Sequence, residues 1–319
     1  MKVYTAEEIK KFESMTDKEI QDLNEEDFLY VYKTMKQHNY EKASNTVDMV
    51  IFTIDDEKRE EDKSAKARLQ TLMIKRGGHP FKNQWAIAGG FMDMNEDLDT
   101  AVKRELKEET GLENVYTEQL YTWSEVERDP RMRVISSSYM ALLPKHQMAN
   151  AVAGDDAIDV DWFDISSEIL DHNVQLISET KVVETLKVNL VLESETNQAS
   201  TVLKVINTTE GTISNQTIEI VERNGIAFDH SKILYTALER LRGKVDYTNI
   251  VFNLMPKKFT LVELQSAYET ILGRTISKAT FRRHVQNMVV PLDEIDDASK
   301  TRPAQLYKYN ILWKHSTTY

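Results

Sequence analysis

The stretch that decides the fold of this chain is GFMDMNEDLDTAVKRELKEETGL, residues 90–112. Its second half, residues 98–110, consists mostly of helix-forming residues and is followed at once by a glycine, a common C-terminal cap. On an α-helix, Glu105, Glu108 and Glu109 stand at positions i, i+3 and i+4 and therefore share one face. Carboxylates this close repel one another unless cations neutralise them. The stretch therefore predicts a helix with a clustered acidic face.

A divalent cation would neutralise this acidic face. Oxygen ligands with room for water favour Mg²⁺, or Mn²⁺, over zinc. Gly89 and Gly90 allow a tight turn ahead of the helix and can bring a backbone carbonyl to the metal. Arg104 can reach back toward Glu96 or along the helix toward Glu108, where it would orient a ligand. The stretch thus indicates a magnesium site, although helices rich in Glu, Lys and Arg are also common as solvated surfaces.

The complete spacing of residues 90–112 resembles the Nudix box, G-x5-E-x7-R-E-U-x-E-E-x-G-U with U a bulky apolar residue, at every defined position. The resemblance implies an α/β/α sandwich around a mixed sheet. It also implies hydrolysis of a nucleoside diphosphate linked to another group, in which divalent ions bridge the phosphates while water attacks phosphorus. The catalytic residues implied are Glu96, Arg104, Glu105, Glu108 and Glu109, and the metal ligands implied are Glu105, Glu108 and Glu109 with the Gly89 carbonyl.

The identity of the general base stays open. Members of the Nudix superfamily use either the first helix carboxylate, here Glu105, or a carboxylate from a later loop. The loop candidates in this chain are Glu125, Glu127, Asp155 and Asp156.

Four segments are expected along the chain, in an α+β fold. Residues 1–44 are polar and contain two capping-box sequences, at Thr5 and Thr16, so we expect short helices. Residues 45–173 form the Nudix domain, with strands expected at 47–54, 70–75, 134–143 and 158–163 and a hairpin loop at 55–66. Residues 174–226 alternate β-formers with turn residues and predict a small β-rich insertion without chemistry of its own. Residues 227–319 form the last segment.

The flanks of the acidic helix carry a second resemblance. RGGHPF (76–81), WAIAGGF (85–91), RDPRMRVIS (128–136) and AFDH (227–230) resemble the ADP-ribose pyrophosphatase branch of the superfamily. More closely, they resemble Nudix-related transcriptional regulators of NAD metabolism. Guanidinium groups suit pyrophosphate oxygens and aromatic rings can stack on adenine. The predicted substrate contacts are Arg76, Phe81, Trp85, Arg128 and Arg131, with Trp123 as a further aromatic ring. For the aromatic residues the competing interpretation is packing in the core. For Arg131 it is a salt bridge on the surface.

Two positions depart from these relatives. Ala88 stands where they usually have proline before the Gly-Gly pair, and Met132 follows Asp-Pro-Arg where glycine is common. The first departure loosens a turn. The second reshapes the rim of the expected pocket.

The last segment predicts a winged helix-turn-helix. Helices are expected at 231–242, 260–272 and 277–288, the last two joined by a short glycine-containing turn and followed by a hairpin. Positions 229–319 carry 14 Lys and Arg against 9 Asp and Glu, whereas the whole chain has a net charge of −12. Within the resemblance this module binds DNA, and the predicted contacts are Lys278, Arg282, Arg283, Gln286 and Arg302. Acidic residues at the start of the wing, Asp293, Glu294, Asp296 and Asp297, oppose that interpretation, and winged helices also serve as dimerisation or lid modules.

The composition excludes several classes of protein. The absence of cysteine rules out a disulfide framework and a thiolate metal site. No apolar run approaches the roughly 20 residues that cross a bilayer, and the N-terminus lacks the apolar stretch of a signal peptide. We therefore expect a cytoplasmic protein that does not associate with membranes.

Two functions compete. The first is a magnesium-dependent hydrolase that cuts ADP-ribose into AMP and ribose 5-phosphate, and the unbroken set of catalytic carboxylates favours it. The alternative is a transcriptional regulator of NAD metabolism that senses ADP-ribose through its Nudix domain and binds DNA through the winged helix. One protein can combine both. The resemblance implies a homodimer in either case.

Overall fold

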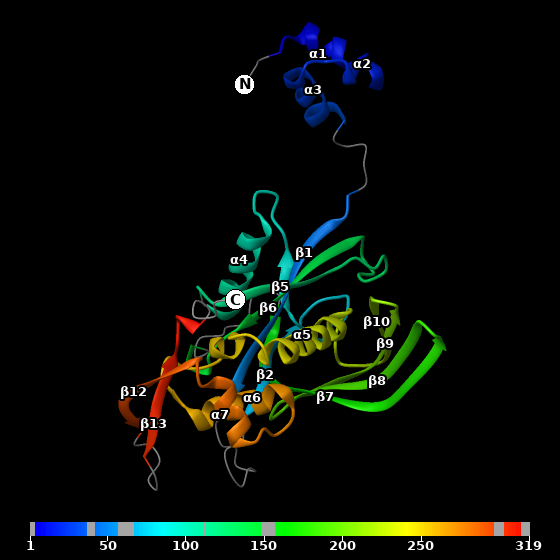
Figure 1. Cartoon of the computed structure of the whole chain (residues 1–319). Coiled ribbons are helices and arrows are strands. Elements are labelled where there is room, and N and C mark those ends of the chain that lie inside the picture. The colour runs from blue at the N-terminus through cyan, green and yellow to red at the C-terminus, as the bar shows by residue number, and fades with distance from the viewer. Residues whose placement is uncertain are drawn as a thin grey trace. The chain divides into compact units, whose positions relative to one another are not determined.

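The computed structural model describes residues 4–36, 42–56, 67–111, 113–147, 157–296 and 303–313. They fall into two compact units, Met1–Ser44 and Asn45–Tyr319, which are described separately (Figure 1). The first unit holds α1 (Ala6–Glu13), α2 (Asp17–Gln21), α3 (Glu25–Val31) and a π-helical turn, Tyr32–Lys36. Its small core is formed by Phe12, Ile20 and Val31. Both predicted capping boxes, at Thr5 and Thr16, are present.

The second unit is built on one ten-stranded sheet. The strand order is β10-β9-β8-β7-β2-β1-β6-β5, with β3 paired to β2 and β4 paired to β1. The strands are β1 (Ser44–Asp55), β2 (Arg68–Arg76), β3 (Trp85–Ala86), β4 (Ala88–Phe91), β5 (Tyr116–Trp123), β6 (Val134–Leu142), β7 (Ala157–Ser178), β8 (Lys181–Glu193), β9 (Gln198–Glu210) and β10 (Ile213–Asn224). β1 and β2 are antiparallel neighbours, as a hairpin requires; most of their predicted loop lies outside the described residues.

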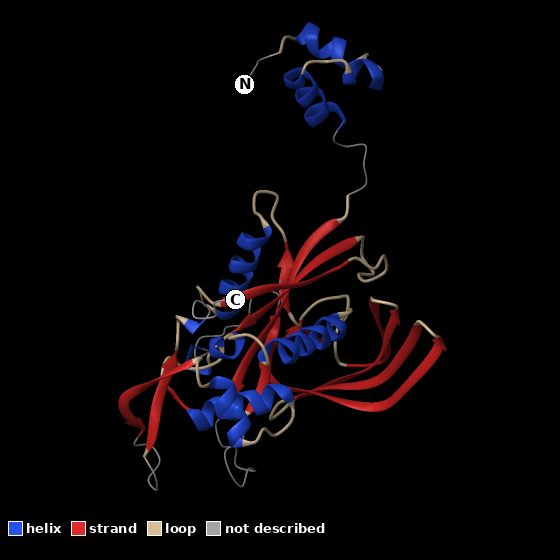
Figure 2. Cartoon of the chain, in the orientation of Figure 1, coloured by secondary structure: helices blue, strands red, loops and turns tan. Residues whose placement is uncertain are grey.

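Both faces of the central strands are buried. Along β1, Met49 and Ile51 pack into one cluster with α4 (Leu98–Thr110), and Val50 and Phe52 pack into a second with α5 (His230–Val245). Because side chains alternate between the faces of a strand, an almost continuous apolar run means that helices cover both sides. Figure 2 shows these helices and strands by colour. The result is the helix–sheet–helix arrangement expected from the Nudix resemblance.

The β-rich segment continues the central sheet. A short strand was expected at 158–163, but β7 extends over Ala157–Ser178 and pairs on opposite sides with β2 and β8. β8, β9 and β10 then add antiparallel strands outward from β7. The boundary expected at residue 173 therefore falls inside a strand, and the meander is an extension of the Nudix sheet.

The C-terminal elements form the predicted winged helix. They are a 3-10 turn (Ile250–Asn253), β11 (Phe259–Thr260), α6 (Leu261–Leu272), α7 (Lys278–Val285), β12 (Val289–Asp296) and β13 (Ala304–Tyr309). The three strands make a small sheet in the order β11-β13-β12. Leu264 of α6 and Phe281 of α7 belong to the same hydrophobic cluster as Val50 of β1 and Leu234 of α5. The winged helix thus shares a core with the Nudix sheet. Across the described ranges, no helix is both long and apolar enough to cross a membrane.

Candidate metal and ligand site

The acidic helix α4 has the bounds that the sequence predicts. It begins after Asp97, whose side chain accepts a hydrogen bond from the Thr100 backbone N–H at 2.8 Å, and ends at Gly111 in the left-handed conformation with φ 70°. Its buried side includes Val102 and Leu106, which pack against β1 and β6. This packing fixes the helix on the sheet and leaves its carboxylates beside β4.

Arg104 connects the carboxylates of the box. Its guanidinium donates to Glu96 at 2.7 and 3.1 Å, to Glu105 at 2.8 Å and to Glu108 at 3.1 Å. The sequence offered Glu96 and Glu108 as alternative partners, and the structure shows Arg104 bonded to both. The bond to Glu96 is the main cause of the raised pKa of Arg104. Arg104 therefore stays charged and holds the acidic cluster together.

The two glycines of β4 are required by close packing. A Cβ atom on Gly90 would lie 2.3 Å from Glu105 Oε1. Gly89 has φ 152°, and its Cβ atom would lie 2.3 Å from the carbonyl oxygen of Val47 on β1. Only glycine avoids these overlaps. The glycine pair thus lets the backbone of β4 lie directly against Glu105. A backbone carbonyl that binds a metal together with this carboxylate would need such a close approach.

Glu109 is the member of the cluster that lacks a counter-charge. Its Oε2 atom is buried and has no hydrogen-bond partner among the described residues. Burial, followed by the charges of Glu105 and Glu108, raises its pKa to about 7. Burial also raises the pKa of Glu105, against the opposing effect of Arg104. An unpaired buried oxygen within a set of hard oxygen donors fits a divalent cation.

The cluster is not a finished metal cage. Within the described part of the chain, no three acidic or histidine side chains are already arranged to hold an ion. Arg104 occupies Glu105 and Glu108. A cation bound at Glu109 would therefore share these two carboxylates with Arg104.

The loop candidates for the general base differ in their surroundings. Glu125 is exposed and both of its carboxylate oxygens accept hydrogen bonds from Lys232 of α5, at 2.7 and 2.9 Å. Glu127 is exposed in the same loop. Asp155 and Asp156 lie outside the described residues.

Arg128, a predicted substrate contact, is buried between two carboxylates. Its guanidinium donates to Asp229 at 2.8 and 3.0 Å and to Asp48 at 3.2 Å, and its side chain is 5% exposed. Asp48 also accepts a hydrogen bond from the Ser136 hydroxyl at 2.5 Å. His230 lies beside this group and is fully buried, and its Nδ1 accepts the backbone N–H of Ile87 at 3.1 Å. It is therefore a packing residue.

Arg76 and Arg131 gather around one phenylalanine that was not foreseen. The guanidinium carbons of Arg76 and Arg131 lie 4.8 and 5.9 Å from the ring centroid of Phe228. Phe81 lies 4.7 Å from the same ring, centroid to centroid. Arg131 also pairs with Asp129 at 2.8 Å, and 39% of its side chain is exposed. Three of the five predicted substrate contacts thus converge on Phe228.

The tryptophans follow the packing interpretation. Trp85 is 4% exposed and contacts Phe163 edge-on, and Trp123 is 8% exposed and donates its indole N–H to Ser138. Their rings are committed to the core, so neither can stack on a base without repacking. Trp85 thus has a packing role in the structure, and its contact with a ligand stays a prediction.

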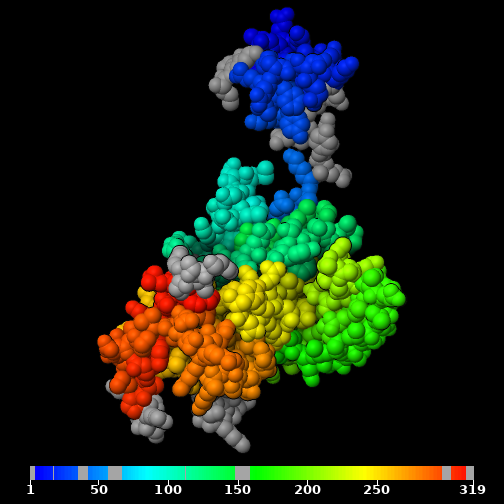
Figure 3. All heavy atoms as spheres, viewed as in Figure 1, coloured from blue at the N-terminus to red at the C-terminus, as the bar shows by residue number. Residues whose placement is uncertain are grey.

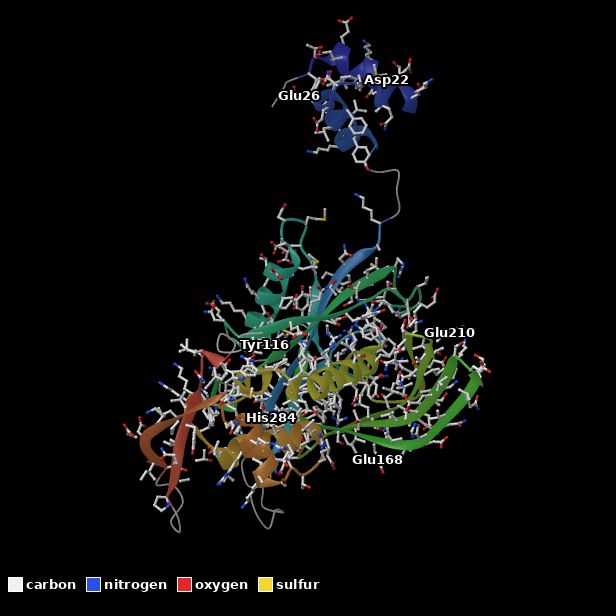
Figure 4. All side chains as sticks on the ribbon, in the orientation of Figure 1. Asp22, Glu26, Tyr116, Glu168, Glu210 and His284 are labelled. Carbon is white, nitrogen blue, oxygen red and sulfur yellow. The ribbon has the colours of Figure 1, made fainter. Side chains whose placement is uncertain are left out.

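The predicted DNA contacts of α7 share its outer face. Phe281 and Val285 are buried against the core, whereas Lys278, Arg282, Arg283 and Gln286 are exposed. No carboxylate of the described ranges forms an ion pair with Arg282 or Arg283. His284, labelled in Figure 4, packs its ring against Tyr268 of α6. Arg302 and Asp297 of the wing lie outside the described residues, and Glu294 is paired with Lys258.

Comparisons with known proteins agree with both halves of this architecture. A model of the NUDIX domain matches residues 64–176, and a model of the NrtR DNA-binding winged helix domain matches residues 251–309. The ADPR responsive transcriptional repressor NtrR of Acinetobacter baylyi is 30% identical over 291 residues, which are 90% of this chain and 89% of that protein. The chain belongs to the NrtR family.

Solved structures extend this family assignment. A MutT/nudix family protein from Enterococcus faecalis is 28% identical and matches with a TM-score of 0.64, over 97% of this chain and 100% of that one. Shewanella oneidensis NrtR complexed with a 27mer DNA is 25% identical, with a TM-score of 0.56 over 85% of this chain and 95% of that one. An ADP-ribose pyrophosphatase of Methanocaldococcus jannaschii is 40% identical over 96 residues, 30% of this chain and 55% of that protein.

Several residues of this NrtR-family site were missed from sequence. Asp48 is a lone acidic residue in the apolar strand VDMVIFTI, and that exception was a usable signal. Phe228 and Asp229 belong to the AFDH stretch, which was noted only as a local match. Their contacts with Arg76 and Arg128 could not be foreseen from local pattern, because about 100 residues or more separate each pair.

Proposed function

We propose that this NrtR-family chain is a DNA-binding transcriptional regulator that recognises ADP-ribose through its Nudix domain. The observation that carries the proposal is the shared core between the Nudix sheet and a winged helix with a basic outer face. The similarity to an ADPR responsive repressor over nine-tenths of the chain supports it. A ligand at the Nudix domain and DNA at α7 would thus act on one packed body.

The ligand half of the proposal rests on the chemistry around Phe228. Arg76 and Arg131 lie 4.8 and 5.9 Å from its ring centroid, and Arg131 also lies 5.7 Å from the ring centroid of Phe91 at the end of β4. Guanidinium groups donate paired hydrogen bonds to phosphate oxygens, so two of them suit a diphosphate. Arg131 is partly exposed and is the residue most accessible to such a ligand.

The DNA half rests on α7. A recognition helix of this kind enters the major groove with its exposed side chains against the base edges. Arg282 and Arg283 are suited to guanine, and Gln286 to adenine. The acidic wing residues would keep β12 away from phosphates, so α7 is the principal contact in this proposal.

A second candidate function is hydrolysis of ADP-ribose, and one observation favours it. The buried, unpaired oxygen of Glu109 beside Glu105 is a feature that ligand binding alone does not need. Bound Mg²⁺ or Mn²⁺ would offset the phosphate charge and acidify a water molecule. Glu105, Glu108 and Glu109 would hold the ion with the Gly89 carbonyl, and Arg104 would keep Glu105 and Glu108 in place through its bonds to both.

The regulator is tested by fluorescence anisotropy with DNA from upstream of the gene for this chain and of NAD-metabolism genes, against scrambled DNA. We expect sequence-selective binding that ADP-ribose changes. Binding without sequence preference, or binding that ADP-ribose leaves unchanged, would refute the regulator. Sedimentation of the same sample tests the homodimer, which remains a proposal.

Hydrolysis is tested separately, by release of AMP from ADP-ribose with Mg²⁺. Glu109→Gln should abolish turnover, whereas the matched control Glu113→Gln should not. Glu113 lies beyond the end of α4 and pairs only with the exposed Lys107 in the described structure. No AMP from the wild type would remove hydrolysis and leave the regulator standing.

A further inference from the structure

Each of the three arginines predicted to hold the ligand contacts one of two neighbouring residues. Arg76 and Arg131 face the ring of Phe228, and Arg128 is bonded to Asp229. Phe228 and Asp229 form the junction between the β-meander and α5. They lie next to each other in sequence, yet they meet arginines from two separate parts of the Nudix domain, the end of β2 and the loop between β5 and β6.

The bond between Arg128 and Asp229 is buried. The two side chains are 5% and 6% exposed, and Arg128 donates to both carboxylate oxygens of Asp229. Such paired, charge-assisted hydrogen bonds are the strongest that side chains form. Opposing charges hold this junction, so a new anion close to Arg128 competes directly with Asp229.

Asp229 makes no use of its position at the start of α5. Aspartate is among the preferred N-cap residues because its carboxylate accepts the free N–H groups of the first turn. Here Asp229 is the N-cap residue but forms no such bond, because its carboxylate is turned to Arg128. Its carboxylate therefore has two alternative partners, Arg128 or the first turn of α5.

Phe228 is held in an unfavourable backbone conformation. Its φ is 49°, a region that bulky residues rarely adopt. Phe81, which packs against it, has φ 60°. Strained residues persist only where the surrounding structure enforces them, and they concentrate at ligand sites and switches.

Helix α5 leads from this junction to the winged helix. Its 16 residues span about 24 Å. Leu234 and Leu241 pack in the core that also contains Leu264 of α6. Near the far end, Arg242 donates to the carbonyl of Ile271 on α6 at 3.2 Å. In Figure 3, α5 (yellow) lies between the meander (green) and the winged helix (orange).

A second ion pair attaches the same helix to the same ligand loop. Lys232, one turn after Asp229, is bonded to Glu125 at 2.7 Å. The loop that carries Arg128 and Arg131 is thus tied to the first turn of α5 at two points.

We propose that Phe228 and Asp229 are positioning residues that couple the ligand arginines to the winged helix. In the structure, Arg128 holds Asp229, and Arg76 and Arg131 lie 4.8 and 5.9 Å from the Phe228 ring centroid. An anionic diphosphate attracts these arginines, and Asp229 turns to cap α5. The helix start then shifts, and α5 passes the change to α6. This inference rests on the proposed recognition of ADP-ribose and specifies how that site regulates DNA binding.

The test measures three quantities for the full chain: affinity for ADP-ribose, affinity for the selected DNA, and the ratio of DNA affinities with and without saturating ADP-ribose. Asp229→Asn keeps a good N-cap residue and weakens the hold on Arg128. Phe228→Leu keeps an apolar side chain and removes the ring that Arg76 and Arg131 both face. The control is Glu219→Gln, which removes an exposed carboxylate that pairs with Lys204 on the neighbouring strand, outside α5 and away from these arginines.

We expect a wild-type ratio within about 5- to 150-fold, the usual range of allosteric coupling. In Asp229→Asn the ratio should fall below about twofold, while ADP-ribose binds as tightly as in the wild type or up to about tenfold more tightly. A merely structural role would instead weaken ADP-ribose binding and lower the melting temperature. Phe228→Leu should also reduce the ratio, and Glu219→Gln should not.

Wild-type ratios in both junction variants, measured at saturating ligand, would overturn the coupling. If Asp229→Asn does not fold, Phe228→Leu decides. If the wild type binds ADP-ribose without any change in DNA affinity, the proposed regulator fails. The proposed role of Phe228 and Asp229 is then tested by hydrogen exchange of the backbone amides of residues 229–233, measured with and without ADP-ribose. A ligand-induced change there, absent in the junction variants, supports it; no change overturns it. A wild type that binds no ADP-ribose refutes both proposals.

Discussion

Replacing Gly90 by alanine tests the geometry of the acidic site directly. The added Cβ would lie 2.3 Å from Glu105 Oε1, whereas ordinary contacts begin near 3.4 Å. The carboxylate of Glu105 must therefore move by about 1 Å. It cannot move freely, because Arg104 holds it at 2.8 Å and its side chain is 8% exposed.

The consequence should be large for chemistry and moderate for stability. A displacement of about 1 Å at a reacting centre costs on the order of 10²-fold in rate. We therefore expect Gly90→Ala to reduce AMP release from ADP-ribose by about 10²-fold. Overpacking by one methyl group costs about 1–3 kcal/mol of unfolding free energy.

The matched control is Gly243→Ala. Gly243 lies within α5, and a Cβ there meets nothing within 4 Å. Alanine in a helix should stabilise the protein by about 0.5–1 kcal/mol, with unchanged turnover. Both variants are assayed for AMP release, and for the rise in melting temperature that Mg²⁺ produces, which does not depend on turnover.

Gly90→Ala protein with wild-type turnover and a wild-type response to Mg²⁺ would refute the reasoning. It would mean that Glu105 can shift without consequence and so is not a metal ligand held by its contact with β4. If the wild type shows no turnover, the response to Mg²⁺ alone decides.

Three further predictions follow from the same structure. Arg104→Leu should lower the unfolding free energy by about 1.5–3 kcal/mol in metal-free buffer, because it leaves several carboxylates without a charged partner. Adding Mg²⁺ should restore part of this loss. An unfolding free energy equal to that of the wild type in a denaturant titration would contradict the prediction. Arg282→Ala should weaken DNA binding. If Arg282 contacts a phosphate, the slope of log affinity against log salt concentration should fall by about 1, and if it contacts a base, the sequence preference at one base pair should weaken. Affinities measured across a salt series and a panel of single-base DNA variants distinguish these two results from no contact. Burial lowers the pKa of His230, so below pH ~6.5 the unfolded chain takes up a proton that the folded chain does not. The free energy of unfolding should therefore fall by up to ~1.4 kcal/mol per pH unit as the pH drops from there toward the pKa of the folded state. His230→Gln should flatten this dependence of stability on acid pH, and an unchanged slope would show that His230 does not contribute.

The sequence was sufficient for features that depend on local spacing. The bounds of α4 follow from the Asp97 cap, the periodic apolar residues and Gly111, all within 15 residues of chain. The apolar strand at β1 and the capping boxes at Thr5 and Thr16 are equally local. The exposed basic face of α7 follows from helical spacing alone. The family models then confirmed the Nudix domain and the winged helix.

Other strands escaped prediction because local pattern does not define them. β5, YTEQLYTW, lacks a regular alternation and is stabilised by its pairing with β6. β7 was expected to be short, because polar residues interrupt its apolar pattern beyond residue 163. Its length comes from pairing with β8, whose ladder runs from Asp164 to Ser178.

By itself the sequence determined which residues carry charge, which face of α4 is acidic and which face of α7 is basic, because a helix converts fixed spacing into a fixed direction. Only the tertiary structure decided what those charges meet. Arg128 lies 101 positions from Asp229, and Arg76 is brought to Phe228 from the end of β2. Long-range burial selects such partners, because a charge removed from water must find its counter-charge wherever the fold places one.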